Sequence, residues 1–143
     1  MVEEGIGYVG HASSKRGASL EKLIWIGLAG VLGTYARYGL SGIVQRTCGS
    51  AFPCGTLAVN VLGCFLFGLV WSLAEDRLLI SGEVRTVVLI GFMGAFTTFS
   101  SFAFETAQLV RDAEWTLALG NLLAQNVVGI AGLFLGFIAG RLL

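Results

Sequence analysis

Four long apolar stretches dominate the sequence and constrain the fold more than any other feature. Each stretch is near or above the roughly 20 residues that an α-helix needs to cross about 30 Å of hydrocarbon. We therefore predict four transmembrane helices, at about 23–44, 54–74, 84–110 and from 115 to the carboxyl end. Hydrophobic residues make up 55% of the 143 residues and charged residues only 13%, which excludes an ordinary soluble domain. The expected fold class is an all-α integral membrane protein.

The first 19 residues differ in composition from the rest of the chain. They are rich in glycine and serine and contain no apolar run of signal-peptide length. We expect a flexible N-terminal tail at 1–19 and one four-helix transmembrane domain at 20–143. His11, the only histidine, lies in this tail, which argues against histidine catalysis in the membrane.

Two further observations narrow the function classes. The formal net charge is zero and no basic cluster is present, so the electrostatic footprint of a nucleic-acid-binding protein is missing. The cysteines at 48, 54 and 64 match no metal-ligand spacing, and their odd number leaves at least one outside any intramolecular bridge. We interpret all three cysteines as buried residues without chemical function.

Positive charges near the helix ends give only a weak orientation signal. Arg37, Arg46 and Arg111 fall on one side of the membrane, against Lys22, Arg77, Arg85 and Arg141 on the other. Adding Lys15 and Arg16 from the tail makes the count three against six, a moderate preference for both termini in the cytoplasm. A charge bias of this size still allows the chain to insert in both orientations.

Regularly spaced glycines indicate close helix contacts, since small residues let helix backbones approach each other in lipid. They include Gly132, Gly136 and Gly140 in the fourth helix and Gly27, Gly30 and Gly33 in the first. Packing within one chain is the simplest interpretation. A four-helix chain of this size encloses little space, however. We therefore hypothesise an antiparallel homodimer, in which a solute pathway forms where two inverted copies meet.

The stretch GFMGAFTTFSSF, residues 91–102, is unusual for the middle of a transmembrane helix. Glycine weakens a helix, and threonine hydroxyls can bond the backbone in place of the helical ladder. We expect the third helix to be broken near its middle, around Gly94 and the pair Thr97 and Thr98. Non-helical backbone at this depth survives only where protein or water satisfies it, so a break predicts a buried polar site with carbonyls free to hold a cation.

Phe99 and Phe102 follow the expected break three residues apart and therefore share a helix face, with Ser101 beside them. Aromatic ring edges carry partial positive charge and hydroxyls are donors, so this face could guide a small anion that sheds its water. The alternative is that both rings face lipid or a partner helix.

Amides deep in the second and fourth helices add donors. Asn60 lies in the middle of GTLAVNVLGCFLFG and is costly in hydrocarbon unless it forms hydrogen bonds, either to a solute or to another helix. Asn121, Gln125 and Asn126 lie in the fourth helix. Among ionisable groups, only Arg37 and Glu105 fall well inside the expected helices; they either reach the interface or pair with each other.

Three ordered motifs resemble the Fluc (CrcB) family of fluoride channels. They are GTYARYGLSG in the first helix, GTLAVNVLG in the second and GFMGAFTTFSSFAFE in the third, and the resemblance spans all four helices. It implies a passive, fluoride-selective channel in the cell inner membrane that lets cytoplasmic fluoride leak out and so confers fluoride resistance. It also implies a dual-topology homodimer with two pores and a central structural sodium ion.

The resemblance also assigns roles to single residues. Phe99 and Phe102 match pore-lining phenylalanines, Asn60 matches a pore asparagine, and Ser101 matches a hydroxyl beside them. Gly94 and Thr97 match positions whose backbone carbonyls hold the sodium ion. Arg37 matches the arginine after the glycine-rich stretch of the first helix, and Glu105 matches an acid beyond the phenylalanines. The fourth helix lacks a tyrosine that many members have; we assign its Asn126 to the pore, although the helix register could favour Gln125.

These features favour a channel over other classes. A fluoride path needs dense donors, here Asn60, Thr98 and Ser101, without a fixed cation that would trap the anion. No nucleophile with a base, phosphate loop or metal motif is present, so we predict no enzyme.

The alternative is a proton-coupled exporter of the small multidrug resistance type. Such a protein needs a mid-membrane carboxylate, which the first helix lacks and which Glu105, near a helix end, suits poorly. A passive scaffold subunit would not need aligned amides and hydroxyls.

Overall fold

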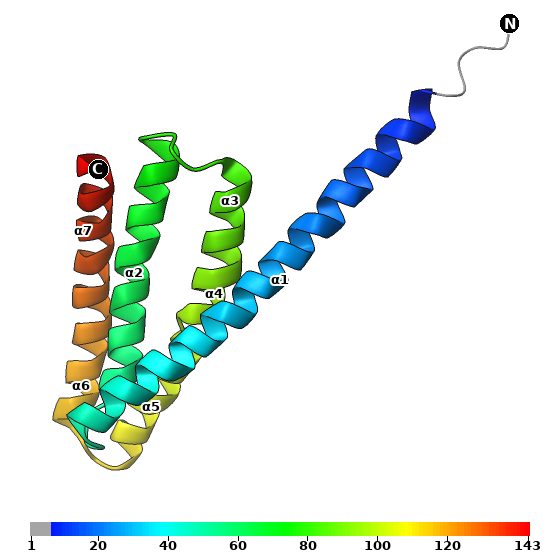
Figure 1. The fold of residues 1–143 in the computed structure, drawn as a ribbon. Coiled ribbons are helices and arrows are strands. Elements are labelled where there is room, and N and C mark those ends of the chain that lie inside the picture. Colours follow the sequence, from blue (N-terminus) through cyan, green and yellow to red (C-terminus); the bar gives the residue numbers. More distant parts are fainter. Residues whose placement is uncertain (1–6) are drawn as a thin grey trace, which may run out of the picture.

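The computed structural model describes residues 7–143, which form only helices and short connections within that range (Figure 1). The elements in chain order are α1 (Gly7–Cys48), α2 (Cys54–Glu75), α3 (Gly82–Thr86), the π-helix η1 (Val87–Met93), α4 (Gly94–Phe96), α5 (Phe99–Arg111), α6 (Trp115–Leu123), the π-helix η2 (Ala124–Val128) and α7 (Gly129–Leu142).

Four helical segments are long and apolar enough to cross a membrane, which confirms the predicted all-α, four-span architecture. They cover Ser19–Cys48, Cys54–Glu75, Gly82–Arg111 and Trp115–Leu142. The first helix begins earlier than predicted, because α1 extends back to Gly7 and projects beyond the other helices (Figure 1). Residues 1–6 of the predicted tail, and the side chain of His11, lie outside the described part of the structure. The flexibility of residues 1–19 and the domain division at residue 20 stay predictions.

The fourth span packs against α2 through glycines, as the glycine spacing predicted for contacts within one chain. A side chain at Gly136 would collide with the carbonyl oxygen of Phe65, and one at Gly68 with that of Leu133. A Cβ atom at Gly132 would lie 3.2 Å from the carbonyl oxygen of Val61. Small residues on both helices thus bring the two backbones into direct contact.

The first and third spans pack in the same way. A side chain at Gly33 would collide with the carbonyl oxygen of Phe92, and a Cβ atom at Gly91 would lie 2.7 Å from that of Ile26. A small apolar core lies between α2 and the first and third spans, and it consists of Val59, Leu89, Met93 and Phe96. These contacts hold the middle of the third span against both α1 and α2.

The helix ends are held by polar contacts. Ser81 caps α3, since its Oγ accepts a hydrogen bond from the Val84 amide at 3.4 Å. Beyond the end of α2, Asp76 forms an ion pair with Arg141 of α7 at 2.9 Å. The hydrogen bond from Arg141 lowers the pKa of the Asp76 carboxyl, with a smaller contribution from Ser72. The pair therefore keeps Asp76 ionised and ties the ends of α2 and α7 together.

The interpretation of the cysteines as three buried residues is wrong. Cys48 and Cys54 form a disulfide between the end of α1 and the start of α2. Cys48 is exposed, and the free cysteine, Cys64, is only half-buried. Cys48 and Cys54 pair because they flank a tight turn that joins the two helices.

Large apolar side chains are uncovered on α1 and at the start of α5. Along α1 these include Leu28, Val31, Leu32 and Tyr35, each more than half exposed, and α5 adds Phe99 at 78%. A single chain therefore covers little of its first span.

Candidate functional site

Two residues interrupt the helical path of the third span. Thr97 and Thr98 have extended backbone dihedral angles between α4 and α5. The side chain of Thr98 caps α5 by accepting a hydrogen bond from the Ser101 amide at 3.2 Å, and its hydroxyl donates to Ser101 Oγ at 3.0 Å. The hydroxyl of Thr97 donates to the Met93 carbonyl at 3.0 Å. The Met93 carbonyl also accepts from the Thr97 amide at 3.0 Å, so only the Thr98 side chain satisfies a backbone group that the helices leave open, the Ser101 amide.

Asn60 of α2 provides hydrogen-bond partners for the main chain of Thr98. Its Oδ1 accepts from the Thr98 amide at 2.8 Å, and its Nδ2 donates to the Thr98 carbonyl at 3.1 Å. The same Nδ2 donates to Gln125 Oε1 of η2 at 3.0 Å. Both donor hydrogens of Asn60 are therefore engaged within the protein.

Gln125 is left with an unused donor. Its side chain is 9% exposed, and its Nε2 is buried without a hydrogen-bond partner in the described chain. A buried amide group without a partner is costly, so such a donor indicates a place for a ligand or water. Asn126, by contrast, is exposed, and its Nδ2 donates to the Leu122 carbonyl of its own helix at 2.7 Å.

Phe99 and Phe102 lie in contact, edge to face, with ring centroids 5.5 Å apart. Phe102 is buried and Phe99 is exposed. Both line an open cavity of about 450 Å³, together with Asn60, Thr97, Thr98, Gln125 and Asn126. The remaining lining residues are Gly63, Cys64, Phe67, Leu133 and Phe137. No lining residue carries a charge, so the polar groups of this cavity are amides and hydroxyls beside aromatic rings.

A second crevice, of about 470 Å³, lies on the other side of Thr98 and contains the charged candidates. Arg37, Thr98, Ser101 and Glu105 line it with residues of α1 and α2. Glu105 accepts a hydrogen bond from the Thr56 hydroxyl at 2.6 Å. Among the described residues Arg37 and Glu105 form no ion pair with each other, although they share the crevice.

The backbone at Gly94 and Thr97 fits a cation that binds carbonyl oxygens. In a continuous helix their carbonyls would accept from the amides of Thr98 and Ser101. Those amides instead donate to Asn60 Oδ1 and Thr98 Oγ1. Gly94 is also exposed, with only the Leu89 carbonyl oxygen, at 4.0 Å, near the position of a Cβ atom. Both carbonyls thus lack their usual helical partners.

The structure therefore gathers most of the predicted residues around Thr98. Asn60, Phe99, Phe102 and Ser101 meet there, and the assignment of Asn126 to the pore stays a prediction, because Gln125 is the amide that contacts Asn60. Two polar contacts were not predicted from the sequence: the bond from Thr56 to Glu105 and the bond from Asn121 to Thr106 at 2.9 Å. Both pairs join polar residues on different spans, and only their shared polarity within apolar helices signals them.

Together, the four spans and the uncharged polar cavity define a multi-pass membrane protein with the features of a passage for a small solute. The family model of the CrcB-like protein, Camphor Resistance (CrcB), matches residues 24–137. A protein of Nitrosococcus oceani named fluoride-specific ion channel FluC is 59% identical over 86% of this chain and 98% of its own length. A protein of the same name from Desulforapulum autotrophicum is 56% identical over 85% and 98%. The chain belongs to the CrcB-like family. The relatives are named as ion channels, a family without enzymatic activity.

Proposed function

We propose that this protein is a passive, fluoride-selective ion channel that releases cytoplasmic fluoride down its electrochemical gradient. The observation that carries the proposal is the uncharged cavity at Thr98, where the rings of Phe99 and Phe102 lie beside amides and hydroxyls and Gln125 Nε2 has no partner in the described chain. Fluoride is small and strongly hydrated, so its path must replace water with donors yet hold the anion weakly enough to release it. The names of the relatives support the choice of ion.

Within this cavity the roles divide between the two amides. Asn60 uses its donors on Thr98 and Gln125, so it positions the extended segment and the glutamine. Gln125 Nε2 has no partner in the described chain and is free to donate to an anion. The positive edges of Phe99 and Phe102 extend the path within this cavity, and the hydroxyl pair of Thr98 and Ser101 extends it toward the second crevice, which both residues line. The Asn126 amide, bonded to its own helix, is the weaker candidate.

The functional unit in this proposal is an antiparallel homodimer with two pores in the cell inner membrane. The uncovered apolar face of α1 and the exposed ring of Phe99 would be buried against a second copy. The extended segment at Thr97 and Thr98 is then the mid-membrane break of the third helix. The carbonyls of Gly94 and Thr97, from both copies, would hold a structural sodium ion, which supplies positive potential without a fixed cation in the pore.

A proton-coupled exporter is the alternative function, and one observation bears on it. Glu105 Oε2 is buried without a hydrogen-bond partner in the described chain, which makes Glu105 the only candidate for a coupling carboxylate at this site. It lines the crevice on the Arg37 side of Thr98 and does not line the cavity of Phe99 and Phe102. Efflux from liposomes that contain only this chain separates the two functions, because a channel conducts fluoride without a proton gradient and an exporter moves protons with a drug.

A further inference from the structure

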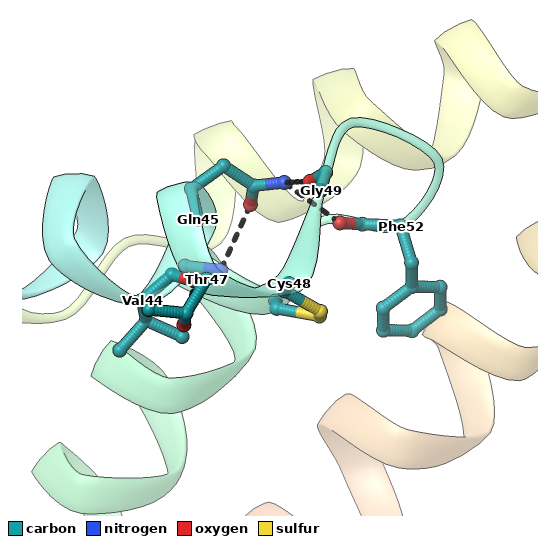
Figure 2. Close-up of a disulfide and its surroundings, with 8 residues drawn as sticks. Val44, Gln45, Thr47, Cys48, Gly49 and Phe52 are labelled. Carbon is teal, nitrogen blue, oxygen red and sulfur yellow. Dashed lines mark hydrogen bonds between the residues drawn. A yellow bond between two sulfur atoms is a disulfide. The ribbon is translucent and has the colours of Figure 1, made fainter.

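The disulfide between Cys48 and Cys54 closes the first helical hairpin at the membrane boundary (Figure 2). Cys48 is the last residue of α1 and Cys54 the first of α2, and their Cα atoms are 6.3 Å apart. This separation lies in the range that a disulfide spans. The turn therefore brings the two cysteines close enough for a bridge.

The side chain of Gln45 holds the same turn independently of sulfur (Figure 2). Its Nε2 donates to the carbonyls of Gly49 at 2.5 Å and Phe52 at 2.9 Å, and its Oε1 accepts from the Gly55 amide at 3.0 Å. We therefore expect the turn to keep its form when the bridge is open. The two thiols would remain opposite each other and could be oxidised or reduced without refolding.

The turn faces one aqueous compartment only. It lies at the opposite end of α2 from the connection between α2 and α3, so the two connections are on opposite sides of the membrane (Figure 1). Cys48 and the turn residues Gly49, Ser50 and Ala51 are exposed. Disulfides persist in oxidising compartments and are rare in the cytoplasm. The redox state of this pair therefore depends on which side of the membrane the turn faces.

We propose that the Cys48–Cys54 disulfide forms only in copies whose turn faces the oxidising compartment, so that each antiparallel dimer carries one bridged turn and one dithiol turn. This inference rests on the antiparallel pairing in the proposed function. It makes the two halves of a dimer with identical sequences chemically different.

The oxidation is a thiol–disulfide exchange with a protein disulfide of the oxidising compartment. A thiolate of one cysteine attacks that disulfide and releases one of its sulfurs. The thiolate of the second cysteine then attacks the mixed disulfide and releases the other sulfur. The partner leaves as a dithiol, which takes up the two protons that Cys48 and Cys54 lose.

The redox state is measured in cells that express the full chain with Cys64→Ala, which removes the third thiol. Acid quenching followed by N-ethylmaleimide blocks free thiols, and reduction and a heavy maleimide then mark every chain that held the bridge. Orientation is measured separately in a Cys48→Ser, Cys54→Ser, Cys64→Ala chain that carries Ser50→Cys. A membrane-impermeant maleimide added to intact cells labels only the copies whose turn faces outward.

The proposal predicts that the bridged fraction equals the outward-facing fraction and that both are about half, as an antiparallel pair requires. Ser50→Lys with Ala51→Lys should hold the turn on the cytoplasmic side and lower the bridged fraction. A bridged fraction near zero or near one while half the turns face outward would overturn the redox inference. If nearly all or nearly none of the copies have an outward-facing turn, a dimer cannot contain one bridged turn and one dithiol turn, and the proposal is also overturned.

A separate measurement of fluoride efflux, from liposomes that contain the wild-type chain, distinguishes failure of the redox inference from failure of the proposed function. Efflux together with mismatched fractions rejects the redox inference alone. Matched fractions near half without efflux reject the fluoride channel and leave the redox inference standing.

Discussion

The side chain of Asn60 and the main chain of Thr98 are joined by two hydrogen bonds that run in opposite directions. The Thr98 amide donates to Asn60 Oδ1 at 2.8 Å, and Asn60 Nδ2 donates to the Thr98 carbonyl at 3.1 Å. An extended backbone residue in an apolar span thus finds in one side chain both partners that a helix would have supplied. The cavity with Phe99 and Phe102 is lined by both residues.

Asn60→Leu should reduce fluoride flux about tenfold or more, which corresponds to a conduction barrier higher by roughly 1.4 kcal/mol or more. The leucine leaves the amide and carbonyl of Thr98 without partners, and each unsatisfied group costs about 1–3 kcal/mol. Flux is measured with a fluoride electrode on reconstituted protein, and stability by thermal unfolding in detergent. Thr86→Val is the control, because the Thr86 hydroxyl bonds only to the Gly82 carbonyl of its own helix and Thr86 does not line this cavity. Equal flux in the two variants would contradict a positioning role for Asn60.

Phe99→Ile and Phe102→Ile should each reduce fluoride flux while the protein still assembles. Isoleucine keeps much of the apolar volume but removes the aromatic ring whose positive edge would contact the anion in the proposed path. Phe104→Ile is the control, because Phe104 lies on the same helix, α5, and does not line this cavity. Size-exclusion chromatography checks assembly. Normal flux in both Phe99→Ile and Phe102→Ile would argue that these rings only face lipid or pack against a neighbouring helix.

Gln125→Leu should lower fluoride flux more than Asn126→Leu does. Gln125 has a buried Nε2 without a partner in the described chain, whereas the Asn126 amide already donates to Leu122. Gln125→Asn should restore part of the flux, since it returns an amide donor to the cavity. The opposite ranking of the two leucine variants would assign the pore amide to Asn126.

Gly94→Ala and Gly136→Ala should fail in different ways. A side chain at Gly136 collides with the Phe65 carbonyl, so alanine there should destabilise the single chain. At Gly94 only the Leu89 carbonyl lies within 4.0 Å, so alanine should leave the chain folded but disturb the dimer or its sodium ion. Cross-linking in membranes and the sodium dependence of flux test this distinction. Normal dimers with normal, sodium-dependent flux in Gly94→Ala would remove that residue from the sodium site.

Features that depend on local sequence were predictable. The four spans follow from the length of the apolar runs, and the contact between Phe99 and Phe102 follows from their spacing. The choice between Gln125 and Asn126 was not predictable, because both lie in the π-helix η2, where the wider turn changes the helical phase. The bonds between Thr56 and Glu105 and between Asn60 and Gln125 depend on how separate helices align. The disulfide depends on the tightness of the turn at 49–53.

Fluoride efflux from liposomes that contain only this chain tests the central claim most directly. The liposomes are loaded with potassium fluoride, valinomycin removes the electrical barrier, and an electrode follows external fluoride without a pH gradient. We predict rapid fluoride efflux, little chloride efflux under the same conditions, and slow efflux from liposomes that carry Phe102→Ile. Wild-type liposomes that release fluoride no faster than empty ones would contradict the account.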